Sequence, residues 1–241
     1  LGTRDLARAR AATDAPGVQA DTEAAWSSAL TRGLDLPPPR HCRGIALHTE
    51  GTQALKALLE LLDSATARID IEMFIFRDDA VGTRIAEALR RASQRGVAVR
   101  VLLDGLGAFA GHRRSARMLR DAGARLRWFS PLRLRLRPQF GRGNLRNHRK
   151  LVVVDARACW SGGRNFASEY FLDEADAAAW RDLSFVVEGR LVVDAVACFE
   201  RDWASAGGDE PPRPIPAVDP DAHGPLAQLL PSGPDRRDDT A

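Results

Sequence analysis

Residues 67–104 read ARIDIEMFIFRDDAVGTRIAEALRRASQRGVAVRVLLD, and their pattern decides the fold class of the chain. Residues 67–76 alternate into a strand rich in isoleucine and phenylalanine. A helical pattern over residues 81–95 ends at Gly96, and residues 97–104 follow as a second, buried strand. A strand, a helix and another strand in this order predict a βαβ unit.

The alternation of helix and strand continues on both sides of this unit. Leucine and alanine recur at helical spacing over residues 52–65, and the order helix then strand is repeated at residues 115–123 and 124–129. Three more strands and a closing helix are expected over residues 151–155, 158–162, 183–189 and 191–206. We therefore predict an α/β fold whose mixed, largely parallel sheet has helices on both faces.

Composition divides the chain into three parts. Residues 1–40 alternate Ala, Arg and Asp and end near three prolines, which predicts a loosely structured N-terminal segment. Residues 41–206 hold the predicted sheet and helices, and the Gly- and Pro-rich residues 207–241 are typical of a linker. No run approaches the roughly 18 apolar residues that a membrane span needs. The three cysteines lie in unrelated contexts, so we expect neither a disulfide framework nor a zinc site.

Positive charge is concentrated in one segment. Residues 113–150 carry twelve arginines and Lys150 against a single acid, Asp121, whereas the chain from Glu169 onward has sixteen acids and six arginines. The basic segment therefore indicates an anionic partner rather than a bias of overall composition. Within it, PLRLRLRP at residues 131–138 alternates leucine with arginine. We expect this stretch to be exposed near the mouth of a site and to place Arg133, Arg135 and Arg137 against anionic lipid, although a charged edge strand fits the same pattern.

The strongest chemical signal is NHRKLVVVDARACWSGGRN, residues 147–165. It contains one of only two lysines in a chain that otherwise uses arginine. If a strand begins at the histidine, His148 and Lys150 point to the same side of it and Arg149 points away. A neutral imidazole beside a compact ammonium can attack and neutralise an anionic centre. Gly162 and Gly163 would let backbone N–H groups approach a phosphate, and Asn165 would add a neutral donor.

These residues resemble the H-x-K-x4-D-x6-G-[GS]-x-N signature of the phospholipase D superfamily, with every spacing matched from His148 to Asn165. The flanking stretches 69–108, RNHRK and WRDLSFVVEG are similar to the cardiolipin synthase branch. The resemblance covers roughly residues 43–204. It implies a phospholipase D-like fold of which this chain is one of two halves.

The resemblance also implies roles for individual residues, in a two-step displacement at phosphorus with no metal or other cofactor. His148 attacks the phosphodiester, and a second alcohol or water resolves the phosphohistidine. Lys150 and Asn165 hold the non-bridging oxygens. Asp182 holds the other imidazole nitrogen, and Asp155 belongs to the signature but is more consistent with bracing the strand end. On the first strand, Asp70 and Glu72 either face this site or serve solubility.

Family active sites are built from two such motifs, and these 241 residues contain one. We therefore expect either the N-terminal half of a longer cardiolipin synthase-like phosphatidyltransferase, or a phosphodiesterase or nuclease that completes its site as a homodimer. A module that only binds anionic lipid or nucleic acid is the third alternative. The first is favoured by residues 229–235, LLPSGPD, which resemble the opening of the second half in that branch. It implies an anionic, phosphatidylglycerol-like substrate and a location in the cytoplasm or at the inner face of the cell membrane.

Overall fold

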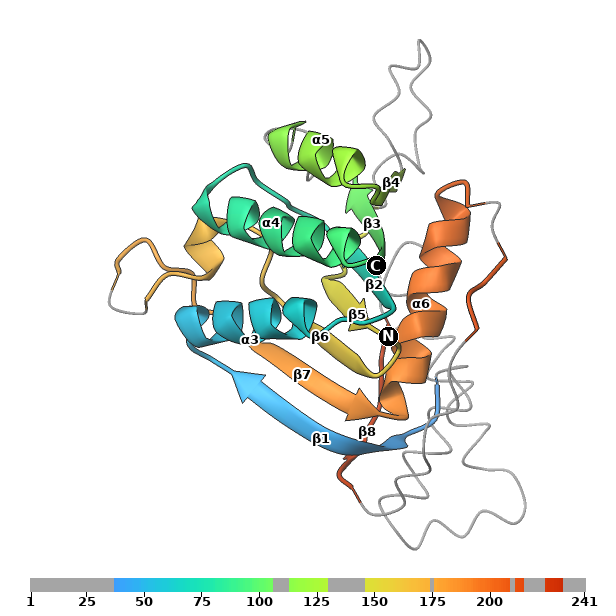
Figure 1. Cartoon of the computed structure of the whole chain (residues 1–241). Helices are drawn as coiled ribbons and strands as arrows, with labels where there is room; N and C mark the ends of the chain where they lie inside the picture. Colours follow the sequence, from blue (N-terminus) through green and yellow to red (C-terminus); the bar gives the residue numbers. More distant parts are fainter. Residues whose placement is uncertain are drawn as a thin grey trace, which may run out of the picture.

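The computed structural model describes residues 37–105, 113–129, 146–173, 176–208, 211–214 and 224–231. These residues form a sheet of eight strands in the order β4-β3-β2-β5-β6-β7-β1-β8, with helices packed against it (Figure 1). In chain order the elements are β1 (Arg40–His48), α3 (Gly51–Asp63), β2 (Arg68–Met73), α4 (Ala80–Gln94), β3 (Ala98–Asp104), α5 (Arg113–Asp121), β4 (Arg125–Phe129), β5 (Leu151–Val154), β6 (Ala158–Gly162), the 3₁₀ helix η1 (Ser168–Tyr170), β7 (Ser184–Gly189), α6 (Leu191–Ser205) and β8 (Leu226–Ala227). Within these ranges, none of the helices combines the length and apolar character that crossing a bilayer requires.

The parallel part of the sheet comes from the βαβ pattern. β2 pairs with β3 and β3 pairs with β4, both in parallel. α4 begins where the Asp79 carboxylate accepts a hydrogen bond from the Gly82 N–H at 2.9 Å, and its C-terminal end is followed by Gly96 with φ of 88°. The predicted order of strand, helix and strand is confirmed, with boundaries close to those expected.

The rest of the sheet is antiparallel, which corrects the expectation of a largely parallel sheet. β5 pairs with β2, and β6, β7, β1 and β8 follow with antiparallel pairing throughout. The turn between β5 and β6 contains Asp155 and Ala156 at φ of 52° and 51°, and the Arg157 N–H closes it on the Val154 carbonyl at 2.9 Å. So short a turn reverses the chain, because a parallel pair needs a crossover of about a dozen residues or more. The sheet is mixed, as predicted, but parallel pairs are the minority.

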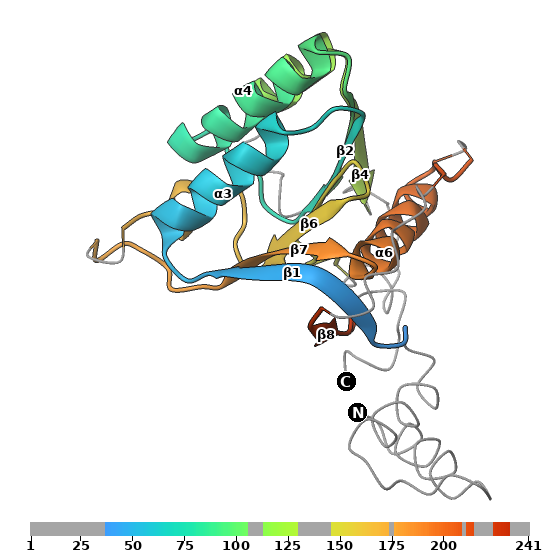
Figure 2. The same ribbon diagram turned by 60° about the horizontal axis from the view of Figure 1, so that its bottom comes forward.

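Apolar side chains pack on both faces of the sheet in two separate clusters. On one face, α3 and α4 cover alternate strand residues such as Ile69, Ile71 and Val152. On the other face, α6 covers Leu151 and Val153. Figure 2 shows α3 and α4 on one side of the sheet and α6 on the opposite side. The prediction of helices on both faces is therefore confirmed.

Two strands are not predicted from the sequence. β1 pairs with β7, and β8 extends the sheet beside Arg40 and His41 of β1. β1 gives little signal because most of its residues are exposed, and β8 has only two residues. β8 lies in the predicted linker 207–241, and Pro214 in the same segment accepts a hydrogen bond from Arg68 at 3.0 Å. The described parts of this segment therefore lie against the sheet.

Candidate active site

Apart from Asp155, the predicted catalytic residues and the two glycines gather at one edge of the sheet, where strands begin or end. β2 and β3 end there, at Met73 and Asp104, and the antiparallel β5 begins there, directly after Lys150. β6 ends at the same edge at Gly162, which pairs with Ser184 at the start of β7. Residues from five strand ends are thus brought together by the topology, although they lie far apart in the sequence.

His148 and Lys150 share one neighbour, the ring of Phe74. The centroids of the His148 and Phe74 rings lie 4.0 Å apart, and Lys150 Nζ lies 5.4 Å from the Phe74 centroid. Arg149, between them, forms an ion pair with Asp202 of α6, on the opposite face of the sheet. The regular strand begins only at Leu151, but the alternation expected for residues 148–150 holds in this extended segment. Lys150 Nζ also donates a hydrogen bond to the His148 carbonyl at 2.6 Å.

The electrostatics of this pair favour an uncharged imidazole. Burial lowers the pKa of His148, the nearby Lys150 ammonium lowers it further, and the Asp104 carboxylate opposes both effects. Burial also lowers the pKa of Lys150, against the attraction of Asp182. The imidazole therefore loses its proton at a lower pH than an ordinary histidine, and the neutral form is the one that can act as a nucleophile.

Asp182 reaches the site from the start of β7. Its carboxylate fills the space beside Gly163, where an added Cβ would lie 2.3 Å from Asp182 Oδ1. The same oxygen accepts a hydrogen bond from the Leu183 N–H at 2.7 Å. Among the described residues no hydrogen bond joins Asp182 to His148, which the resemblance implies, and the charge of Asp182 acts on Lys150. The carboxylate that acts on His148 is Asp104, which sequence reasoning missed.

Asn165 is buried and its amide is oriented by the backbone after β2. Asn165 Oδ1 accepts a hydrogen bond from the Ile75 N–H at 3.1 Å, and the Phe166 N–H donates to the Ile75 carbonyl at 3.0 Å. Phe76 and Phe166 also form a parallel bridge. With its oxygen bound to Ile75, Asn165 offers its NH2 group as the donor to an anion.

Arg164, beside Asn165, is buried to 1% exposure and has a structural role that was not predicted. Its guanidinium donates to the Tyr170 carbonyl at 2.8 Å, the His48 carbonyl at 3.1 Å and Ser184 Oγ at 3.3 Å, and also to the Thr49 carbonyl. It thereby joins the loop that carries Asn165 to β1, β7 and η1. Apart from Tyr170, its partners lie 20 to 116 residues away in the sequence, so no local pattern indicates this role.

The structure gives Gly162 and Gly163 a role other than the expected binding of phosphate. The Gly163 N–H donates to the Leu183 carbonyl at 3.1 Å and is therefore not available to an anion. Gly162 has φ of 141°, and a Cβ there would lie 2.1 Å from the Leu183 carbonyl oxygen. Both glycines are needed because the backbone of β7 and the Asp182 side chain approach too closely for a larger residue.

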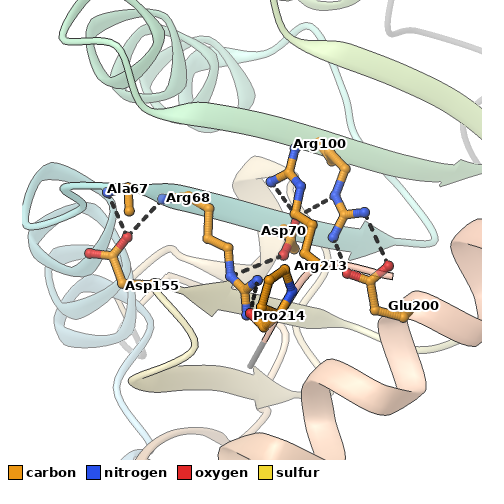
Figure 3. A network of polar contacts seen from close by, with 8 residues as sticks. All are labelled: Ala67, Arg68, Asp70, Arg100, Asp155, Glu200, Arg213 and Pro214. Carbon is orange, nitrogen blue, oxygen red and sulfur yellow. Dashed lines mark hydrogen bonds and ion pairs between the residues drawn. The ribbon is translucent and has the colours of Figure 1, made fainter. Parts of the chain in front are cut away.

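Asp155 lies at the opposite end of β5, away from the other signature residues. Its carboxylate accepts hydrogen bonds from the N–H groups of Thr66, Ala67 and Arg68, at 2.9, 2.8 and 2.8 Å, and from the Thr66 hydroxyl at 3.0 Å (Figure 3 shows Ala67 and Arg68). It therefore fixes the turn between α3 and β2. Asp155 braces the strand end and does not join the site, although the signature groups it with His148.

Two further expectations have mixed outcomes. Asp70 and Glu72 face neither the site nor solvent, because both are buried under α6 at 1% and 2% exposure. The stretch with Arg133, Arg135 and Arg137 lies outside the described residues. In the part of the chain that the structure describes, no group of three or more His, Cys, Asp or Glu side chains is arranged to hold a metal ion.

Comparison with known proteins identifies similar sequences. Residues 58–203 match the family model described as "Cardiolipin synthase, PLD-like domain". The chain is 35% identical over 190 residues to cardiolipin synthase A of Pseudomonas fluorescens (strain SBW25), in an alignment that covers 79% of this chain and 39% of that protein. It is 34% identical over 163 residues to cardiolipin synthase 1 of Bacillus anthracis, covering 67% and 32%. The chain thus spans well under half the length of these relatives.

Solved structures with the same fold are more distant in sequence. NucT from Helicobacter pylori matches with a TM-score of 0.53 and 17% identity, over 67% of this chain and 96% of that chain. The phospholipase D family member Nuc from Salmonella typhimurium matches with a TM-score of 0.51 and 20% identity, over 69% and 95%. Phosphatidylserine synthase from Haemophilus influenzae matches with a TM-score of 0.51 and 18% identity, over 68% of this chain and 38% of that chain. At these identities the likeness shows the fold alone.

Proposed function

Because the chain belongs to the phospholipase D superfamily, in its cardiolipin synthase branch, we propose that it supplies one half of the active site of a phosphatidyltransferase. The observation that carries the proposal is the pair of His148 and Lys150 on one side of the chain against Phe74, with the Asp182 carboxylate attracting Lys150. Asn165 is bonded to the backbone of Ile75, the residue after Phe74. A nucleophile of lowered pKa next to a fixed cation suits attack on a phosphodiester.

The reaction proceeds in two displacements. The neutral His148 imidazole forms a bond to phosphorus while the bond from phosphorus to the leaving alcohol oxygen breaks. Lys150 and the Asn165 NH2 group stabilise the negative charge on the non-bridging oxygens. A second alcohol then forms a new oxygen–phosphorus bond while the bond from phosphorus to His148 breaks, and the alcohol's proton returns to the group that protonated the leaving alkoxide. Asp182 balances the charge of Lys150, and the leaving alkoxide receives its proton from a second histidine outside this motif.

The substrate and location follow from the relatives and from charge. The relatives are cardiolipin synthases, so the proposed donor is an anionic phospholipid such as phosphatidylglycerol at the inner membrane surface. Arginines on the exposed surface of α5 support attraction to such a surface: Arg113, Arg114, Arg117 and Arg120. Each arginine contributes about 1 kcal/mol to the free energy of binding when it lies near an anionic bilayer at moderate salt. Arg133, Arg135 and Arg137, outside the described residues, carry three further positive charges.

The second half of the site comes from a second motif, either on a longer form of the chain or on a second copy. The first alternative is supported by the relatives, of whose length this chain covers 39% and 32%. The second, a homodimeric phosphodiesterase, is supported by Nuc and NucT, of which this fold unit covers 95% and 96%. We favour the first because the sequence identity to the synthases is higher.

A reconstitution experiment tests the proposal. Phosphatidylglycerol vesicles are incubated with the chain alone and with a complementary half that contains a second H-x-K motif, and cardiolipin and phosphatidic acid are measured. We expect negligible transfer by the monomer and transfer by the pair, because loss of a general acid costs about 10²–10⁴-fold. Sedimentation establishes the oligomeric state. Hydrolysis by a homodimer supports the second candidate, and vesicle binding without turnover in either form indicates a binding module.

A further inference from the structure

Asn147, next to His148 in the chain, is buried at 2% exposure between two carboxylates. Its Nδ2 donates to Glu72 Oε1 of β2 and to Asp202 Oδ2 of α6, the latter at 3.1 Å. Its backbone N–H lies 3.3 Å from Asp104 Oδ2 at the end of β3. The side chain therefore contacts β2 and α6, on the face of the sheet opposite to His148, and the backbone contacts the end of β3.

The same side chain also shapes the backbone around the proposed nucleophile. Asn147 Oδ1 accepts a hydrogen bond from the Arg149 N–H at 3.0 Å, so a side-chain turn encloses His148. Arg149 is fixed in addition by its ion pair with Asp202. Residues on either side of His148 are thus held from behind, while His148 and Lys150 project from the other face against Phe74.

We propose that Asn147, clamped between the carboxyl groups of Glu72 and Asp202, is a positioning residue that fixes His148 and Lys150 for attack on phosphorus. The inference rests on the proposed function for the chemistry, but the clamp itself rests on the contacts alone. The hydrogen bonds to two separate elements leave the Asn147 amide one orientation, and its oxygen then sets the direction of the following peptide.

Burial and the charges around the clamp favour the protonated form of Glu72. Three carboxyl groups meet here, on Glu72, Asp104 and Asp202, with two arginines, Arg146 and Arg149. Burial raises the pKa of Glu72 well above its ordinary value, and the neighbouring Asp202 raises it further, against Arg149 and Asn147. Cys198 of α6 lies near Glu72 and Asp202, with Arg201 of the same helix also near Cys198. A neutral Glu72 can accept from Asn147 and donate to Asp202, which closes the clamp without an excess charge.

Asp70 provides a matched control on the same strand. It is two residues from Glu72 on the same face and is buried at 1% exposure. Its partners are Arg100, at 2.6 Å, and more distant arginines that include Arg213 at 3.7 Å (Figure 3). Among the described residues, no hydrogen bond or ion pair joins Asp70 to residues 147–150, so its replacement should disturb the buried polar layer but not the clamp.

The experiment compares four variants of the chain by NMR of the His148 ring, assigned by its loss in His148→Ala, with inorganic phosphate as the probe. Asn147→Ala and Glu72→Ala should move the His148 resonance and weaken the phosphate response about tenfold, a usual size for a supporting residue. Glu72→Gln should stay within about twofold of wild type, because the amide replaces the protonated carboxyl group. Asp70→Asn should lower the melting temperature and leave His148 unchanged.

A double variant and a second route sharpen the test. Asn147→Ala combined with Glu72→Ala should shift the His148 resonance no more than either single substitution, since both substitutions remove the same hydrogen bond. If Asn147→Ala does not fold, Asp202→Asn tests the other arm of the clamp. The proposal is overturned if the clamp variants behave like Asp70→Asn, which means that they lower the melting temperature but leave the His148 resonance unchanged. A wild-type chain without any phosphate response contradicts the proposed function instead, because the shifts of the His148 resonance still report the clamp.

Discussion

The two ends of β5 carry two parts of one sequence signature, and these two parts have different roles. At the start of the strand, His148 and Lys150 are partly exposed, lie against Phe74 and have lowered pKa values. At the other end, Asp155 binds three backbone N–H groups and a hydroxyl of the turn before β2. One sequence signature can thus join a chemical part to a purely structural one.

The link between the two ends is the strand itself. Its four residues, Leu151–Val154, are all buried and alternate between the two apolar clusters of the sheet. Fixing the far end therefore fixes the register in which β5 lies beside β2, and that register decides which side chains appear at the other end. The roles of the two ends can be distinguished by experiment, because the end at His148 should control turnover and the end at Asp155 should control stability.

The largest effect is expected at the chemical end. His148→Ala should lower phosphatidyl transfer by the active assembly by about 10⁴-fold or more, because the nucleophile is lost. The free energy of unfolding should change by less than about 1 kcal/mol, since the side chain is only partly buried. Transfer assays and urea unfolding measure the two quantities, with His48→Ala as the matched control. Substantial turnover in His148→Ala would contradict the assignment.

At the structural end, Asp155→Ala should lower the free energy of unfolding by about 3 kcal/mol, because four donors lose their acceptor at once. The pKa of His148, measured by NMR on the folded variant, should stay at its wild-type value. Urea unfolding gives the stability change. A shift in the His148 pKa without loss of stability would show that the two ends are not separate.

Lys150 distinguishes charge from shape at the chemical end. Lys150→Gln should raise the pKa of His148, because the ammonium that lowers it is removed. Lys150→Arg keeps the charge and should leave that pKa nearly unchanged, but it should slow transfer about tenfold because a planar fork replaces a compact cation. The pKa is measured by NMR and the rate by transfer assay. Equal rates for wild type and Lys150→Arg would argue against a point contact to phosphoryl oxygen.

The smallest effect concerns acid stability at the structural end. Burial alone would raise the pKa of Asp155, but the hydrogen bonds from Arg68, Thr66 and Ala67 outweigh it and lower the pKa below its ordinary value of 3.8. The carboxylate therefore stabilises the fold above the unfolded-state pKa, and this contribution is lost as the pH falls through the lower folded pKa. Asp155→Asn should cost about 1 kcal/mol at neutral pH. The gap from wild type should close below about pH 4 in urea unfolding, whereas a constant gap would exclude this origin.

Much of the fold is predictable from periodicity, and the exceptions have physical causes. The strands and helices between residues 51 and 205 follow from apolar patterns, because each buries one face. The antiparallel direction of β5 beside β2 does not, since the two strands lie far apart in the sequence and no tight turn joins them. β1 escapes prediction because its outward residues, such as Ile45 and Leu47, are exposed at 41% and 65% and leave no clean alternation.

The site is predictable only where its partners lie close in the sequence. The shared side of His148 and Lys150 follows from alternation. The contacts behind them do not, because Asn147 meets Asp202 across 55 residues and Glu72 across 75. Because Asn147 and Arg149 alternate with His148 and Lys150, the sequence indicates that these two polar residues face the interior. It does not indicate which carboxyl groups they contact there.

β8 has a consequence for solubility. A sheet edge with unpaired backbone groups is a template for pairing with another molecule. At one edge, β4 carries Arg125 and Arg127, whose charges discourage such pairing. At the other edge, β1 carries the exposed Leu47 and is more prone to pair with another molecule. Within the described residues, β8 covers the part of β1 at Arg40 and His41. Forms of the chain shortened before Gly224 should therefore aggregate sooner, although the site would be intact.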